Sequence, residues 1–270
     1  MTPLPRHLAG PLLYLVLSTS LAYAQTAPAL DEMRTLLQEG LYALAAQVEG
    51  PELVQSLPEN AEAHYLYARA LYLTGDLATA EAQLEEVRAL SEAEGESQGE
   101  PKPEYAQLGA LIAAAQGDPT RAQALLETTF AQTPNYNVAM DLGRVAWQAG
   151  DFERALRAYR AAAQTPRGGR EPWPHLHEAR LLALNGNYEE SIKVWNNALN
   201  VLDSLSLERN NAANALPSPA YVEAFYGLGE AYEALGEFEQ AAANYDAALA
   251  ADPSFEPATQ ALTRLEEMLR

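Results

Sequence analysis

The sequence contains few residues whose types and spacing could perform chemistry. Its one histidine cluster is His175-Leu176-His177-Glu178. On a helix His175 and Glu178 share a face, while His177 points elsewhere. Two side chains do not complete a structural zinc site, which takes four ligands. The alternative is that these are ordinary residues at a helix start beside Pro174, and on that interpretation the sequence predicts no metal site.

Other catalytic motifs are also missing from the sequence. There is no Gly-rich phosphate loop, no nucleophile elbow and no H-E-x-x-H. Acid pairs such as Glu189-Glu190 and Glu266-Glu267 fall in predicted helices, where they indicate solvated faces. The chain has no cysteine, which excludes disulfides, thiolate metal sites and thiol catalysis. We therefore expect no catalytic residue, no cofactor and no enzyme activity.

The composition is strongly acidic. Seventeen basic residues stand against 37 acidic ones, for a formal charge of −20 over 270 residues. The phosphate backbone and anionic lipid surfaces should repel such a chain, so we expect no nucleic-acid partner. Alternatively, the negative charge serves only to keep the protein soluble.

The first 24 residues have the three parts of a secretory signal peptide. Arg6 and His7 form a short basic start, an apolar stretch follows from Leu8 to Leu21, and Ala22-Tyr23-Ala24 is an A-x-A cleavage site. The apolar stretch is shorter than the roughly 20 residues of a membrane span. The sequence thus predicts an exported protein of the bacterial periplasm or cell envelope, without membrane insertion after cleavage. The alternative is an uncleaved anchor.

Six glycines recur at nearly even steps of 35, 42, 33, 36 and 50 residues: Gly40, Gly75, Gly117, Gly150, Gly186 and Gly236. A period near 34 with a recurring turn is typical of a helical repeat array. A small residue stands seven positions before five of these glycines (Ala68, Ala110, Gly143, Ala179, Gly229). Another stands five positions after them (Ala80, Ala122, Ala155, Ser191, Ala241). Small side chains at both places would let two helices of a pair approach closely.

The last repeat is the clearest, with Phe225, Leu228, Gly229, Tyr232, Gly236, Ala241, Tyr245, Ala248 and Pro253 in order. This pattern resembles the tetratricopeptide repeat (TPR), with Phe for the usual Trp. The resemblance implies an all-α, right-handed superhelical solenoid of helix-turn-helix repeats. It covers most of residues 26–270.

The predicted organisation follows from the glycine register. Residues 1–24 are the signal peptide, and residues 25–60 are a degenerate first repeat or N-terminal cap whose second helix Gly50-Pro51 breaks early. Five repeats occupy residues 61–255, at about 61–94, 103–135, 136–168, 172–205 and 222–255. Residues 256–270 form a C-terminal capping helix. Insertions at 91–103 and 203–219 account for the long steps, the second after an extension of the helix that starts at Tyr188.

The resemblance also implies a concave groove lined by the second, fifth, ninth and twelfth positions of each first helix. The candidate groove residues are Tyr65, Arg69, Tyr72, Met140, Arg144, Trp147, Trp173, Arg180 and Tyr226. The other groove positions hold Glu62, Glu104, Gln107, Leu111, Ala114, Asn137, Leu176, Ala183, Glu223, Glu230 and Glu233. Arginine with aromatic residues is the composition of protein-binding hot spots, and arginine can clamp a carboxylate. The Lys and Asn positions that clamp chaperone tails in this family are absent.

Two alternatives remain for these residues. Each groove arginine could instead neutralise acids on the next repeat, and Trp147 and Trp173 could pack between repeats. We expect a non-enzymatic scaffold that binds a protein or peptide in its groove. Because a fold does not give a function, a role in envelope, pilus or secretion assembly is inferred by analogy alone. The alternative function is structural: the protein would assemble with copies of itself into a homo-oligomer and form a component of the envelope.

Overall fold

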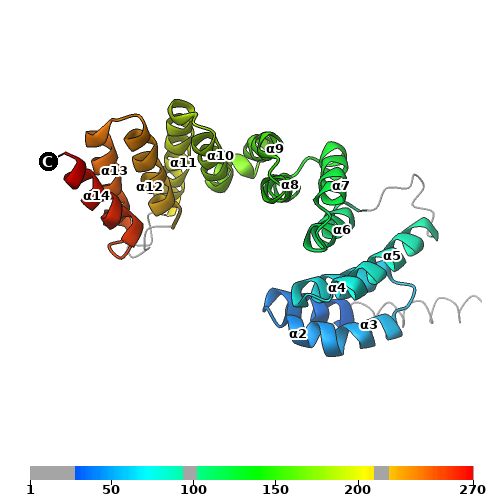
Figure 1. The fold of residues 1–270 in the computed structure, drawn as a ribbon. Helices are drawn as coiled ribbons and strands as arrows, with labels where there is room; N and C mark the ends of the chain where they lie inside the picture. The colour runs from blue at the N-terminus through cyan, green and yellow to red at the C-terminus, as the bar shows by residue number, and fades with distance from the viewer. Residues whose placement is uncertain (1–27, 94–101, 210–218, 270) are drawn as a thin grey trace, which may run out of the picture. The chain divides into compact units, whose positions relative to one another are not determined.

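The computed structural model describes residues 28–93, 102–209 and 219–269, and within these ranges the secondary structure is helical, with no strand. The predicted signal segment, most of the 91–103 insertion and residues 210–218 lie outside the described residues. The chain forms two compact units, residues 1–125 and 126–270, and each is described by itself. Figure 1 shows the helices of each unit in chain order.

The first unit begins with a helix over residues 28–38. It continues with α2 (Tyr42–Leu44), a π-helix (Ala45–Glu49), α3 (Gly50–Ser56), α4 (Ala61–Thr74), α5 (Leu77–Ala93) and α6 (Pro103–Ala115), and the unit boundary falls within α7 (Pro119–Gln132). The second unit holds α8 (Tyr136–Gln148), α9 (Phe152–Gln164), a 3-10 turn (Gly168–Arg170), α10 (Trp173–Leu184), α11 (Tyr188–Arg209), α12 (Pro219–Ala234), α13 (Phe238–Ala251) and α14 (Glu256–Met268). Within each unit helices that follow one another pack together, such as α4 against α5 in the first unit and α12 against α13 and α13 against α14 in the second (Figure 1).

The six periodic glycines all adopt positive φ, between 76° and 88°. Gly236 shows why: its amide bonds Glu233 O at 3.0 Å, and the next amide bonds Tyr232 O at 2.9 Å, which closes the end of α12. Only glycine reaches this backbone region without steric cost. The turn role predicted for these positions is confirmed.

The small residues around each turn are buried where the two helices of a pair meet. The alanines among them, and Ser191, have no exposed surface. At Gly143 the space is taken by Tyr159, because an added Cβ would lie 2.5 Å from Cε1 of that ring. Gly229 faces Tyr245 in the same way, at 2.4 Å. A tyrosine nine residues after the turn glycine therefore requires another glycine seven residues before that turn glycine.

The predicted break at Gly50-Pro51 is wrong. The chain stays helical from Tyr42 to Ser56, through the π-helix and into α3. The wider π turn lets the Gly50 amide bond Ala45 O, and Pro51, which has no N–H to pair, follows directly at the second residue of α3. Gly50 is needed because the Tyr67 ring lies 2.2 Å from where its Cβ would stand.

One of the two insertions differs from expectation, and the described part of the other agrees with it. Helix α5 continues to Ala93, so the start of the 91–103 segment is helical. Helix α11 extends to Arg209, as expected for the segment after residue 203. After α13, helix α14 packs Ala258, Ala261 and Leu265 into one core cluster with Tyr245.

Gly143→Ala should destabilise the protein by about 1–3 kcal/mol, because the new Cβ overlaps the Tyr159 ring. The first two repeats hold Ala and Leu at the equivalent pair of positions (Ala68 with Leu84, Ala110 with Leu126). Adding Tyr159→Leu should therefore recover part of the loss, so that the double variant is more stable than the sum of the single effects predicts. Urea denaturation measures all three variants.

Gly109→Ala is the matched control, because its nearest neighbour would be Leu84 Cδ1 at an ordinary 3.7 Å. It should be neutral or stabilising, since alanine favours a helix. Equal losses at residues 109 and 143 would contradict the packing argument.

Candidate functional site

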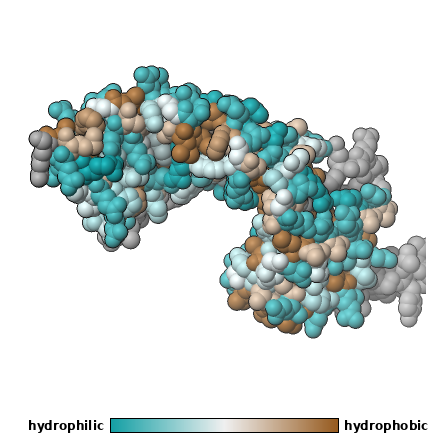
Figure 2. All heavy atoms as spheres, viewed as in Figure 1, coloured by the Kyte–Doolittle hydropathy of each residue, from teal (hydrophilic) through white to brown (hydrophobic). Residues whose placement is uncertain are grey.

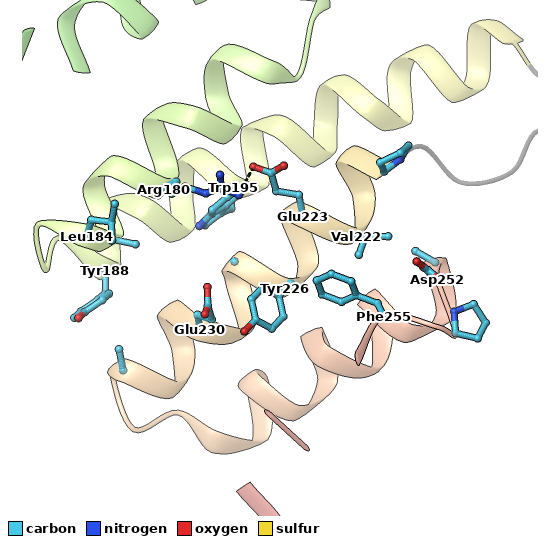
Figure 3. Close-up of a pocket in the computed structure, with 16 residues that line it drawn as sticks. Arg180, Leu184, Tyr188, Trp195, Val222, Glu223, Tyr226, Glu230, Asp252 and Phe255 are labelled. Carbon is cyan, nitrogen blue, oxygen red and sulfur yellow. Dashed lines mark ion pairs between the residues drawn. The ribbon is translucent and has the colours of Figure 1, made fainter. Parts of the chain in front are cut away.

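The second unit contains a pocket of about 850 Å³ among helices α10, α11 and α12 and the connection from α13 to α14. Its walls carry apolar and aromatic side chains with a few charged groups between them. Figure 3 shows Arg180, Trp195 and Glu223 together at one side, and Tyr226 and Phe255 at the other. Pockets of this size and lining are typical ligand sites.

Arg180 of α10 and Glu223 of α12 form an ion pair across the pocket wall. Nη2 of Arg180 lies 2.8 Å from Oε1 of Glu223, and their side chains are 46% and 24% exposed. That oxygen is buried and receives no aligned hydrogen bond, so the contact is one of charge. Arg180 thus pairs with an acid of the following helix pair, as the neutralisation alternative expected for it.

Tyr226 of α12 is held between two aromatic rings. Its centroid lies 5.6 Å from that of Tyr245 and 5.3 Å from that of Phe255, the latter edge-on at 81°. Burial, followed by the negative charge of Glu230, raises the pKa of Tyr226 to about 12. The phenol therefore stays protonated at neutral pH and can donate a hydrogen bond.

Glu233, a further groove position on α12, lies on a different network. Arg264 of α14 donates two hydrogen bonds to its carboxylate, at 3.0 and 2.8 Å, and the Tyr245 hydroxyl donates a third at 2.7 Å. The Arg264 bond is the main reason that the pKa of Glu233 is lowered. Glu233 thus links α12 to α14, and it does not line the pocket.

Trp195 of α11 fills the base of the pocket and packs on α12. A Cβ on Gly227 would lie 2.3 Å from Cζ2 of the indole, so the ring occupies the place of a missing side chain. Trp195 is only 2% exposed. Its indole Nε1 is buried and has no hydrogen-bond partner. An unsatisfied buried donor of this kind costs about 1–3 kcal/mol.

The other predicted groove residues of the second unit lie outside this pocket. Arg144 pairs within its own helix, with Nη2 3.1 Å from Asp141 Oδ1. Trp147 packs edge-on against His177, at 6.5 Å, in a cluster that links α8, α9 and α10, as the packing alternative expected. Met140 is half-buried in that cluster, and Trp173 is 37% exposed at the start of α10.

One groove assignment on α10 is wrong. Leu176 was expected to line the groove, but it is fully buried in the core that α10, α11 and α12 share.

Three predicted residues belong to the first unit and are described there alone. Tyr65 is half-buried and packs on Tyr105, with centroids 4.9 Å apart. Arg69 is exposed on the same helix, and Tyr72 is half-buried against the core of this unit. Arg69 makes no ion pair with any described residue.

Sequence reasoning placed Arg180, Ala183, Glu223, Tyr226 and Glu230 in the groove, and all five line the pocket. It missed the apolar half, which consists of Leu184, Tyr188, Trp195, Val222, Gly227 and Phe255 among others. One signal could have found part of it: Gly227 precedes Gly229 by two residues, so one helix carries two positions without a side chain.

The residues of the histidine cluster lie near the start of α10. Among the described residues no group of three or more His, Asp or Glu could hold a metal ion. His177 stacks on Tyr159, with centroids 4.8 Å apart, and its Nδ1 has no partner. Burial first, and the Arg180 charge second, lower the pKa of His177 to about 4.

None of the helices among the described residues has the length and hydropathy needed to span a bilayer.

Comparison with known proteins agrees with this architecture. Three segments match tetratricopeptide repeat families: residues 61–86, 108–169 and 222–255. No curated protein matches the chain. The chain therefore carries tetratricopeptide repeats, and its fold is an all-α solenoid of them.

Solved structures show the same fold at low identity. YrrB, described as a TPR protein with an unusual peptide-binding site, is 16% identical over 80% of this chain and 98% of its own, with a TM-score of 0.57. MamA is 14% identical over 73% and 93%, with a TM-score of 0.56. BtubC from P. vanneervenii is 18% identical over 86% and 90%, also with a TM-score of 0.56.

His177 should make the protein less stable in mild acid. In the unfolded chain a histidine titrates near pH 6.5, whereas folded His177 stays neutral to about pH 4. Between these values the unfolded state binds more protons, so the free energy of unfolding falls as pH falls. Urea denaturation should show a loss between pH 7 and pH 5 that is about 2 kcal/mol larger for the wild type than for His177→Gln. Equal losses would contradict this assignment.

Proposed function

We propose that the protein is an exported, non-catalytic scaffold that binds a peptide or a segment of a partner protein in the pocket of its second unit. The observation that carries the proposal is the 850 Å³ pocket between the first helices of consecutive pairs, α10 and α12. Its wall contains groove positions, Arg180, Glu223 and Tyr226, that the repeat register assigns to partner binding. The apolar lining supplies contact area, and the few polar groups supply orientation.

The size and chemistry of the pocket favour a peptide over a small polar ligand. Leu184 is 67% exposed at its rim, and such large exposed apolar side chains are suited to contact with a partner. Figure 2 shows a hydrophobic patch at the position of α10 and α11, with mostly hydrophilic side chains around it. YrrB provides an example of a TPR protein that is described as binding a peptide.

We propose further that the scaffold acts in the bacterial cell envelope, in envelope, pilus or secretion assembly. The basic start, the apolar stretch and the Ala22-Tyr23-Ala24 site support export. The intact mass of protein recovered from the producing cell tests this proposal. We expect a chain that begins at Gln25, and a chain that retains residues 1–24 would contradict cleavage.

Ala183→Phe should abolish partner binding, because Ala183 is a half-buried residue of the pocket wall and a phenyl group there would occupy the pocket. Ala243→Phe is the matched control, since Ala243 is exposed on α13 and does not line the pocket. The measurement is recovery of crosslinked partners from native envelope, with thermal melts to verify folding. Loss of partners with Ala183→Phe alone supports the proposal. Equal recovery from both folded variants and the wild type would overturn it.

A further inference from the structure

The pocket wall carries more negative than positive charge. Glu223, Glu230 and Asp252 line it together with a single cation, Arg180, and that cation is already paired with Glu223. Asp252 accepts hydrogen bonds from Ser254 N at 2.9 Å and Ser254 Oγ at 2.7 Å, which leave its charge in place. Glu230 makes no ion pair with any described residue. Neither Glu230 nor Asp252 therefore forms an ion pair with a described residue, although the charges of Arg180 and Arg264 reach Glu230.

Apolar surface lies directly beside these carboxylates. Glu230 and Tyr226 stand one turn apart on α12, while Leu184 and Tyr188 flank the opposite side of the pocket (Figure 3). Phe255 closes the end near Asp252. A ligand that matches this arrangement has a large apolar side chain close to a cationic one. Lysine and arginine also bury their own methylene stems against such apolar walls.

The Trp195 indole at the base of the pocket favours a polypeptide as the ligand. The indole Nε1 of Trp195 is a buried donor without an acceptor. A main-chain carbonyl is the acceptor that every peptide carries. Because Nε1 is covered, a ligand reaches it only when a neighbouring side chain moves.

We propose that the pocket binds a segment of another protein in which a lysine or arginine stands beside a large aliphatic or aromatic residue. This inference rests on the proposed function and adds the chemistry of the partner. The source is a different polypeptide, because this chain has 17 basic residues against 37 acidic ones and should repel a second copy of itself. The charge of the pocket also excludes an acidic tail as its preferred ligand.

Panning a library of random nine-residue peptides against the wild-type protein, with Ala183→Phe as the negative selection, tests the proposal. We expect the enriched peptides to combine Lys or Arg with a nearby Leu, Ile, Phe, Tyr or Trp. Enrichment of acidic peptides, of apolar peptides without charge bias, or of no peptides would overturn it. If Ala183→Phe abolishes partner recovery but the panned peptides show no preference for basic and apolar residues, only this inference fails. The proposed function would then still stand.

A second measurement isolates one carboxylate. Glu230→Gln keeps the shape of the side chain and removes its charge, and Glu239→Gln removes a charge from an exposed position of α13 outside the pocket. In calorimetric titration at low salt, the best basic peptide should bind Glu230→Gln about 5-fold more weakly than the wild type. Glu239→Gln should bind as the wild type does. Equal weakening in both variants, or none in Glu230→Gln, would contradict recognition of the peptide cation in the pocket.

Discussion

The structure depends on close contact between the two helices of each pair. That contact requires a small residue seven positions before the turn and another five positions after it, and those alanines have no exposed surface. The glycine between them ends the first helix at positive φ, so the second helix can return along it. Because the same three positions recur, each pair has nearly the same geometry, and consecutive pairs within a unit present equivalent faces of their first helices.

The pocket arises where this regular packing changes. Nine residues after the turn, the other pairs hold leucine or tyrosine (Leu84, Leu126, Tyr159, Tyr245), whereas the fourth holds Trp195. The larger indole crosses to the next pair and meets α12 at Gly227, which has no side chain to oppose it. Beside that contact, the Arg180–Glu223 ion pair joins α10 to α12 in the pocket wall. The space that remains is lined by apolar side chains and by Glu230 and Asp252, which form no ion pair with a described residue.

The sequence could predict the fold and one wall of the site, and physical reasons limit the rest. Periodic glycines and small residues determine helix pairing locally, so the turns and the positions of Arg180 and Tyr226 followed from the register. The continuous helix at Gly50-Pro51 could not be predicted, because it depends on a π turn and on the Tyr67 ring packing against Gly50. Leu184, Phe255 and Trp195 were missed because they lie on a helix end, a connection and a second helix, outside the groove positions. Arg144 pairs with Asp141 of its own helix, a contact that the groove register does not specify.

The most direct test of the account uses the three tryptophans as separate reporters. The chain contains only Trp147, Trp173 and Trp195, so the indole region of a ¹⁵N–¹H NMR spectrum should hold three cross-peaks, assignable by single Trp→Phe substitutions. Titration with a basic, apolar peptide obtained by panning should shift the Trp195 cross-peak downfield as its free Nε1–H gains an acceptor. Trp173, which lies outside the pocket, should not shift. A Trp195 cross-peak that stays fixed while the peptide saturates the protein would contradict the pocket as the binding site.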